Sequence, residues 1–368
     1  MAIEFRGGSL RIGSTALYPF TSFTFTTARA TGSLGPSGSV ILAEYTGSSS
    51  GSYFSNPTFF TTGSFQGYQI WTVPETATYE IETAGARGGT APAYSGSLTW
   101  GNGAVIKAKV PLIQGQKIMM VVGQVSDAFG VNVNQYGSYQ GFGGGGGSFV
   151  TISGSLPTPL VVAGGGGGSG RYVSYNANSL QTGRSGSTSP SGTPSVFGAT
   201  GGSGSLGGRS HISGSTISAN AYDGGAGGGF LGNGENGNGT LTRPFIAGTY
   251  GEGGNAFVSG SKGGNASTSW GSPPTYPASW GGFGGGGSGN GIIAGGGGGG
   301  YSGGGGGYTP TSPGSDGGGG GGSFIVSSAS SVATSNGLYN GSSSFSGSVI
   351  TNLNTYNSGS GYIKITKL

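Results

Sequence analysis

The side chains that most often carry out catalysis are scarce in this sequence. His211 is the only histidine and cysteine is absent, so a Ser-His-Asp triad, a histidine-based metal cluster and thiolate chemistry all lack the residues they need. Glu80 and Glu82 are two positions apart and would share one face of a strand. A glycosidase needs two carboxylates that oppose each other across a cleft, whereas a solvated strand face is the commoner setting for such a pair. We predict that the protein is not an enzyme and holds no metal or cofactor.

The abundant glycine does not follow a phosphate-binding pattern. No G-x-x-x-x-G-K-[ST] motif occurs, and Lys262 precedes a Gly-Gly pair instead of following a glycine loop. The chain has 14 basic and 10 acidic residues, for a net charge of +4. These few charges are spread evenly, without the basic stripe that would neutralise a nucleic-acid backbone. We predict no nucleic-acid partner.

Aromatic residues in glycine-, serine- and proline-rich segments are stronger candidates, and the chemistry they suggest is recognition. Rigid aromatic side chains anchor many interfaces and stack well on sugar rings. Three such segments, 171–200, 236–250 and 265–282, are expected to be loops. Their candidate receptor-binding residues are Tyr172, Tyr175, Arg184, Phe245, Tyr250, Trp270, Tyr276 and Trp280. The alternative is that these aromatics cap the ends of the glycine-rich region and exclude water from it.

The loops depend on the glycine tracts that lie between them. Glycine makes up 91 of the 368 residues, roughly three times its ordinary share. Runs of five or six glycines occur at 143–147, 164–168, 295–300, 303–307 and 317–322. One interpretation is a flexible low-complexity linker. The favoured one is a bundle of extended, polyproline-II-like glycine helices with three residues per turn, whose N–H and C=O groups pair with those of neighbouring helices.

Alternating apolar and polar residues, and aromatic and β-branched runs, predict β-strands before, within and after this region. The nearly all-apolar segment 117–122 is expected to be a strand buried on both faces. The predicted strands are 23–26, 67–73, 78–84, 104–110, 117–122, 148–152, 160–163 and 359–368. Pro74 should end the second of them, because proline cannot donate to a central ladder. The motif GGGGGSFV at 143–150 recurs as GGGGGGSFIV at 317–326, so a glycine tract is expected to enter a strand in the same way twice. Short strands at this spacing favour a sandwich or jelly roll.

These patterns divide the chain into four parts. We expect a β-sandwich over 23–140, a glycine-rich region with aromatic loops over 141–322, and strands over 323–368 that complete the sandwich. Residues 1–22 are either the first hairpin of the main body or a docking segment that pairs with a partner protein by strand addition. The residues expected to dock with a carrier are Ile3, Phe5, Leu10 and Ile12.

The segment GYQIWTVPETATYEIETAGARGG at 67–89 resembles the glycine-rich extracellular domain of anaplastic lymphoma kinase and leukocyte tyrosine kinase, and the bacteriophage virion proteins that carry the same module. The family pattern is Q-x-W-x-V-P followed by G-x-Y-x-I-x-A-x-G-A-x-G-G, and Thr78 replaces the glycine before the tyrosine. FTFTTARATGSLGPS at 23–37 and LVVAGGGGG at 160–168 also fit. The glycine-rich adhesins at the fibre tips of T-even-type phages are a looser parallel. The family residues present here are Gln69, Trp71, Val73, Pro74, Tyr79, Ile81, Ala84, Gly85, Ala86, Gly88 and Gly89.

The resemblance implies an all-β fold, in which a jelly-roll-like sandwich of tumour-necrosis-factor type carries an inserted bundle of polyglycine-II helices. A phage virion protein is the expected identity, because the sequence shows no signal peptide, no kinase and no run of about 18 apolar residues. We expect synthesis in the host cytoplasm, no insertion into a membrane, and a place on the exposed surface of the virion.

The expected role is that of a fibre tip, tail or appendage protein whose loops bind the host surface non-covalently. Its expected partners are other virion proteins of the fibre, tail or capsid, and a host surface glycan or outer-membrane protein. The alternative is a purely structural capsid or tail decoration or adaptor protein that binds no receptor.

Overall fold

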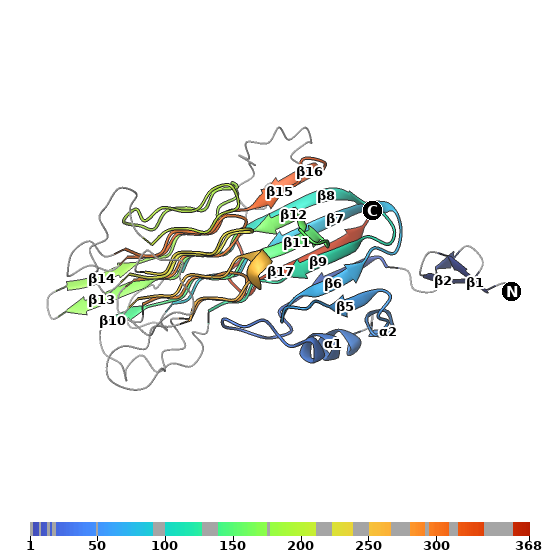
Figure 1. Cartoon of the computed structure of the whole chain (residues 1–368), viewed down its shortest axis with the longest axis horizontal. Helices are drawn as coiled ribbons and strands as arrows, with labels where there is room; N and C mark the ends of the chain where they lie inside the picture. Colours follow the sequence, from blue (N-terminus) through green and yellow to red (C-terminus); the bar gives the residue numbers. More distant parts are fainter. Residues whose placement is uncertain are drawn as a thin grey trace.

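Two antiparallel β-sheets form one half of the molecule, and a glycine-rich region extends from them as the other half (Figure 1). The computed structural model describes residues 3–6, 9–12, 15–16, 20–48, 51–90, 100–126, 139–174, 177–210, 223–237, 250–265, 280–290, 294–308, 316–334 and 356–368.

The larger sheet has six strands, and neighbouring strands in it are antiparallel. In spatial order they are β15 (Phe324–Ile325), β12 (Thr158–Ala163), β11 (Ser148–Ile152), β9 (Lys117–Val121), β6 (Gln69–Thr72) and β5 (Phe60–Thr62). β11 and β15 each continue directly from a glycine tract, which confirms the junction predicted from the repeated motif.

The smaller sheet has five strands and is also antiparallel throughout. In spatial order they are β16 (Ser330–Thr334), β8 (Val105–Leu112), β7 (Ala77–Ala84), β17 (Tyr362–Lys367) and β4 (Ser22–Phe25). The prediction of a mostly β protein with two packed sheets is confirmed. Every strand predicted from alternation has a counterpart in these two sheets, and β6 ends two residues before Pro74 as expected.

Strand β7 shows how alternation builds the core between the sheets. Tyr79 and Ile81 are fully buried, while Glu80 and Glu82 lie on the opposite, partly exposed face. Trp71 of β6 is also fully buried, and its Nε1 donates to the Tyr53 hydroxyl at 3.0 Å. Burial of each large side chain contributes roughly 1.5–3 kcal/mol, and the hydrogen bond avoids leaving the indole N–H unsatisfied.

Two helices, α1 (Gly38–Thr46) and α2 (Gly51–Phe54), lie in the stretch 23–122, where the sequence pattern predicts only strands and turns. That part of the prediction is wrong. Ser37 caps α1 by accepting a hydrogen bond from the Val40 N–H. However, α1 has no acidic residue in its first turn and no basic residue in its last, so the usual helix signals are weak.

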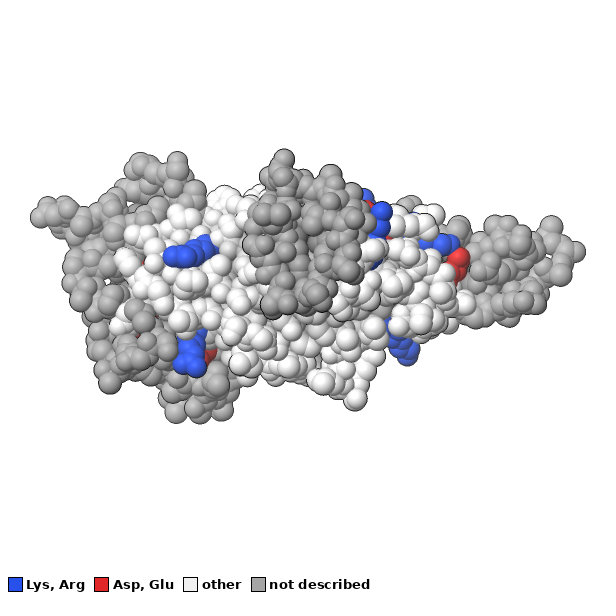
Figure 2. Space-filling model, turned by 90° about the horizontal axis from the view of Figure 1, so that it is seen from above, with Lys and Arg blue, Asp and Glu red and all other residues white. Residues whose placement is uncertain are grey.

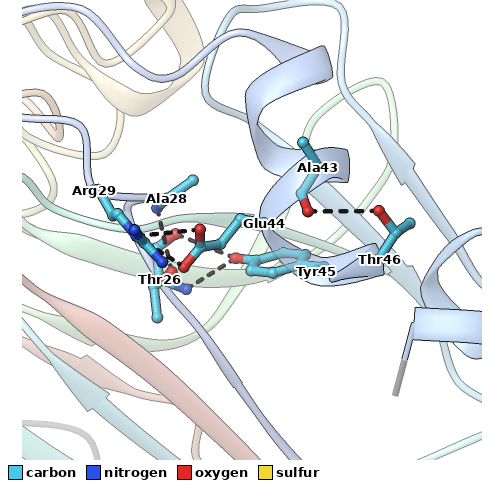
Figure 3. Close-up of polar contacts among 7 residues, drawn as sticks. All are labelled: Thr26, Ala28, Arg29, Ala43, Glu44, Tyr45 and Thr46. Carbon is cyan, nitrogen blue, oxygen red and sulfur yellow. Dashed lines mark hydrogen bonds and ion pairs between the residues drawn. The ribbon is translucent and has the colours of Figure 1, made fainter. Parts of the chain in front are cut away.

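Helix α1 is held against the sandwich by a polar network (Figure 3). The Tyr45 hydroxyl accepts a hydrogen bond from the Thr26 N–H at 2.8 Å and donates to Gln69 Oε1 at 2.7 Å. Arg29 Nε lies 3.3 Å from Glu44 Oε2 at the exposed edge. Burial raises the pKa of Tyr45 to about 12, so its hydroxyl stays neutral and available as a donor.

The six-stranded sheet has apolar clusters on both of its faces, and β9 is largely buried, as predicted for the nearly all-apolar segment 117–122. One face packs on the other sheet, and the outer face carries a second apolar cluster that joins the sheet to the glycine-rich region. The Tyr68 hydroxyl bonds to the Phe257 carbonyl and, at 2.8 Å, to Ser261 Oγ. Phe257 belongs to the short 3-10 helix η2 (Phe257–Ser259). The buried members of this cluster are Tyr68, Val121, Phe149, Val162, Phe230, Phe257 and Phe283.

The glycine tracts run side by side away from the sheets (Figure 1), and their main-chain hydrogen bonds repeat every third residue. In the tract 295–300, the N–H donors of residues i and i+3 reach the same neighbouring segment, and three successive residues reach three different ones, at 2.8–3.2 Å. Gly295 and Gly298 donate to Asp316 and Gly319, Gly296 and Gly299 to Phe142 and Gly145, and Gly297 and Gly300 to Gly225 and Gly228. Each such tract is therefore surrounded by others on several sides.

Neighbouring tracts approach too closely for a side chain. A Cβ on Gly166 would lie 1.8 Å from the Gly101 carbonyl oxygen, and one on Gly319 would lie 2.0 Å from that of Thr193. The buried positions of these segments that are not glycine include small residues such as Ala226 and Ser302. The stretch 199–210 turns at Gly204 and Ser205, whose φ angles are 59° and 71°.

Two small sheets lie at opposite ends of the molecule (Figure 1). One contains β1 (Ile3–Arg6), β2 (Ser9–Ile12) and β3 (Thr15–Ala16), and it is separate from both sandwich sheets. The other contains β10 (Tyr139–Gly141), β13 (Gly170–Ser174) and β14 (Ala177–Gln181), at the far end of the glycine-rich region.

Substitution of Gly166 or Gly319 by valine is expected to prevent stable folding. The added Cβ would overlap main-chain oxygen atoms that cannot move without separating several tracts, and we expect a loss of more than about 4 kcal/mol. Gly154→Val is the matched control, because a Cβ there would make only an ordinary 3.5 Å contact. Thermal melting followed by circular dichroism measures the effect. Unchanged melting of both tract variants would show that the tracts are linkers.

Candidate binding site

The segments of the glycine-rich region turn back at the end farthest from the sandwich. A continuous series of main-chain hydrogen bonds joins residues that flank the segments 211–222, 238–249, 291–293 and 309–315. In each bond the N–H of the first residue donates to the carbonyl oxygen of the second. The bonds are Gly237 to Gly251 (2.8 Å), Gly251 to Asp223 (2.9 Å), Gly224 to Gly307 (2.9 Å), Gly307 to Gly295 (2.7 Å) and Gly295 to Asp316 (2.8 Å). Residues on the two sides of these segments therefore lie in one common layer, which we call the distal layer.

Two of the predicted site residues adjoin this layer. Tyr250 precedes Gly251 and Trp280 precedes Gly281, and both side chains are half-buried. The two positions are linked through the segment between them, because the Asn265 N–H donates to Glu252 Oε2 at 2.8 Å and Gly281 donates to the Gly264 carbonyl at 2.9 Å. The structure thus brings these two aromatics from separate loops to the same end of the molecule.

Arg184 and Tyr172 are placed by different elements. Arg184 lies on the side of the bundle, where its N–H donates to the Gly318 carbonyl and its own carbonyl accepts from Gly167, both at 2.8 Å, and its side chain is exposed. Tyr172 lies in β13, with Tyr139 of β10 and Ser179 of β14 as its register partners. The remaining predicted residues Tyr175, Phe245, Trp270 and Tyr276 lie outside the described residues.

Aromatic residues also cap the glycine-rich region, but at its other end. Phe230, Phe257 and Phe283 are buried against the six-stranded sheet, where the tracts meet the sandwich. Phe230 stacks on Phe257 with ring centroids 5.1 Å apart. Sequence analysis missed this cluster, because each phenylalanine stands alone among glycines without strand or helix periodicity. The only signal was an isolated large apolar residue in a chain segment otherwise free of them.

Asp316 is a buried carboxylate in the distal layer that sequence analysis also missed. Its Oδ1 accepts a hydrogen bond from the Phe197 N–H at 3.0 Å and its Oδ2 accepts from the Tyr308 N–H at 2.7 Å. It therefore ties two other segments to the start of the tract 317–322. Burial raises the pKa of Asp316 to about 6, and the hydrogen bonds from the main chain only partly offset this.

Charged groups are sparse over the glycine-rich half of the surface (Figure 2). Among its described residues, the charged side chains with the greatest exposure are those of Arg184 and Arg209. The described surface of this half therefore offers few groups for ion pairs.

The two glutamates considered for catalysis lie on the sandwich and share a face, as predicted. Lys107 Nζ contacts Glu80 Oε1 at 3.0 Å and Glu82 Oε2 at 3.2 Å, and the Tyr362 hydroxyl donates to Glu82 Oε1 at 2.7 Å. Burial lowers the pKa of Lys107, but the two carboxylates outweigh it and the net pKa is raised. This is the arrangement of a cross-strand ion pair on a partly exposed sheet.

Within the described ranges no group of three or more potential ligands is placed to hold a metal ion, and no helix has the length and hydropathy of a membrane span. His211 lies outside those ranges. Comparison with protein-family models and with curated proteins finds no match to this chain.

The free energy of unfolding is expected to fall as pH rises from about 4 to 7, through Asp316. Its pKa is near 3.8 when unfolded and about 6 when folded, so the folded state keeps the proton in this window while the unfolded state loses it. The contribution lost amounts to roughly 3 kcal/mol at most. Urea unfolding of the native protein and of Asp316→Asn at several pH values measures it. Equal pH slopes for the two proteins would contradict this assignment.

Proposed function

We propose that the protein is a structural component of a bacteriophage virion surface, at a fibre tip, tail or other appendage, and that it contributes to host recognition by non-covalent binding. The observation that carries the proposal is the common distal layer, in which residues that flank several connecting segments are hydrogen-bonded to one another. Loops held at one end of a rigid scaffold can vary in sequence without disturbing the fold, and such loops often carry binding residues.

We further propose that the tracts are polyglycine-II helices. The three-residue repeat of their hydrogen bonds supports this, because a polyproline-II-type helix has three residues per turn and no internal hydrogen bonds. A jelly-roll relationship for the sandwich is part of the same proposal and rests on the resemblance of residues 67–89 to the family named above.

Rigidity is what the bundle contributes to binding. Ordering a flexible loop on binding costs about 0.5–1.5 kcal/mol for each immobilised side chain. Where the two ends of a loop are hydrogen-bonded to each other, as Gly237 and Gly251 are, part of that ordering has already been met in the folded protein. Half-buried aromatics such as Tyr250 and Trp280 are suited to stacking on sugar rings of a host surface glycan, and an outer-membrane protein is the other receptor class that the proposal includes.

We assign attachment to the particle to the end of the molecule opposite the distal layer. The β1–β3 sheet is distinct from the sandwich and lies at the end of the molecule away from the distal layer (Figure 1). Its outer strands have free edges within the sheet, which suit strand addition by a fibre, tail or capsid protein. This placement would direct the loops away from the particle.

Combined substitution of Trp270, Tyr276 and Trp280 by alanine is expected to reduce adsorption of phage to host cells about tenfold or more, because large aromatic anchors dominate many interfaces. Phe65→Ala is the matched control, since Phe65 is 47% exposed but lies on the sandwich. Adsorption rates of particles with normal protein content provide the measurement. Normal adsorption by such particles would favour the alternative of a decoration or adaptor protein.

Deletion of residues 1–16 is expected to abolish incorporation into particles while the sandwich still folds, because the deleted sheet is separate from the two main sheets. Immunoblotting of purified particles measures incorporation, and circular dichroism of the isolated protein checks folding. Full incorporation of the truncated protein would place the docking surface elsewhere.

A further inference from the structure

Glu252 places a buried carboxylate between two of the connecting segments. The residue is 5% exposed and lies three positions after the segment 238–249. Its Oε2 accepts a hydrogen bond from the Asn265 N–H at 2.8 Å, and Asn265 directly precedes the segment 266–279. A carboxylate is costly to bury unless hydrogen bonds replace those of the lost water, and a bond to an ionised acceptor is a strong one. One side chain therefore joins the end of one segment to the start of another.

The main chain of Glu252 is held on several sides. Its N–H donates to Ser288 Oγ at 2.7 Å, and the Ser288 N–H donates back to the Glu252 carbonyl at 2.9 Å. The same carbonyl oxygen lies so close to Gly225 and Gly264 that a Cβ added to these residues would be 2.1 and 1.9 Å from it. Three neighbouring segments thus enclose the residue. Because its main chain is held in place, its carboxylate holds the Asn265 N–H at one position.

The same contact links the two half-buried aromatics of the candidate site. Tyr250 precedes Glu252 by two positions. The residue after Trp280 donates its N–H to the Gly264 carbonyl at 2.9 Å, and Gly264 directly precedes Asn265. A short series of contacts through the Glu252 carboxylate therefore connects Tyr250 with Trp280.

We propose that Glu252 is a positioning residue that fixes Tyr250 and Trp280 relative to each other, so that the two aromatics form a single receptor-contacting surface. This inference rests on the proposed recognition function and deepens it, because it names two separate loops that act as one unit. A receptor that contacts both rings binds more tightly when their relative position is set before binding, since less ordering remains to be done.

Hydrogen exchange of the full-length protein, followed by mass spectrometry, tests the coupling. Glu252→Met keeps a side chain of similar length but removes the acceptor. It is expected to raise exchange about tenfold or more both in the peptide that contains Tyr250 and in the peptide that contains Asn265, because a hydrogen bond to a buried carboxylate is lost. Glu252→Gln is expected to exchange like the native protein, since its amide oxygen can accept the same bond. Unchanged exchange of either peptide in Glu252→Met would overturn the proposal.

Asp316→Ala is the matched control. The Asp316 carboxylate also accepts main-chain N–H groups in the distal layer, but from Phe197 and Tyr308. Its removal is therefore expected to leave the peptides that contain Tyr250 and Asn265 unaffected. An equal rise in the control would show a general loosening of the bundle and would also overturn the proposal.

Adsorption of particles that carry each variant separates the coupling from the recognition function. Glu252→Met is expected to slow adsorption about tenfold and Glu252→Gln to restore the native rate, because the two side chains differ chiefly in whether they can accept the hydrogen bond. If exchange rises in both peptides while adsorption stays normal, the coupling is confirmed and the receptor function of these loops is contradicted.

A second set of variants tests the shared surface even if Glu252→Met fails to fold. Tyr250→Ala and Trp280→Ala are each expected to slow adsorption. The double variant is expected to slow it by much less than the product of the two factors, because either loss already breaks the shared contact. A double effect equal to that product would show two independent sites and would overturn the proposal.

Discussion

The hydrogen bond between the main chains of neighbouring tracts is the interaction on which the glycine-rich half depends. Fixing a glycine costs more conformational entropy than fixing any other residue, and a single hydrogen bond returns only about 0.5–1.5 kcal/mol net. A lone tract such as 295–300 could not be ordered on those terms. Its order comes from bonding on several sides at once, which requires that neighbours also lack side chains.

The sandwich holds one end of the glycine-rich bundle in place. The second apolar cluster packs Phe230, Phe257 and Phe283 against the outer face of the six-stranded sheet, and β11 and β15 continue directly from tracts. The start of the bundle is thus fixed both by covalent continuity with strands and by burial of aromatic side chains. From that base, hydrogen bonds between the tracts continue along the bundle to Asp316 in the distal layer.

Much of the fold could be predicted because its signals are local. The segment 148–152 was predicted as a strand and is β11 residue for residue, since its aromatic and β-branched residues favour strands. Helix α1 could not be predicted in this way, because it buries only Ile41 and Tyr45 and its cap, Ser37, resembles any turn residue. Which tract lies beside which in the bundle could not be predicted either, because the glycine tracts have nearly the same sequence.

The candidate site was less predictable than the fold. The positions of Tyr250 and Trp280 near one layer follow from pairings between distant segments, which no spacing in the sequence encodes. Asp316 was missed because an aspartate before a glycine tract is ordinarily a turn residue, and its role as an acceptor appears only when Phe197 and Tyr308 meet it in space.

The nearly side-chain-free interior of the bundle gives the two halves of this chain different thermodynamics. Unfolding the sandwich exposes apolar surface, which raises the heat capacity, whereas unfolding tracts such as 317–322 exposes mainly peptide groups, which lower it. The glycine-rich half therefore adds little to the heat-capacity change of unfolding. Its free energy of unfolding is expected to depend on temperature with little curvature. Cooling weakens the hydrophobic contribution in the sandwich and in the cluster at the base of the bundle, while the hydrogen bonds between tracts depend less on it.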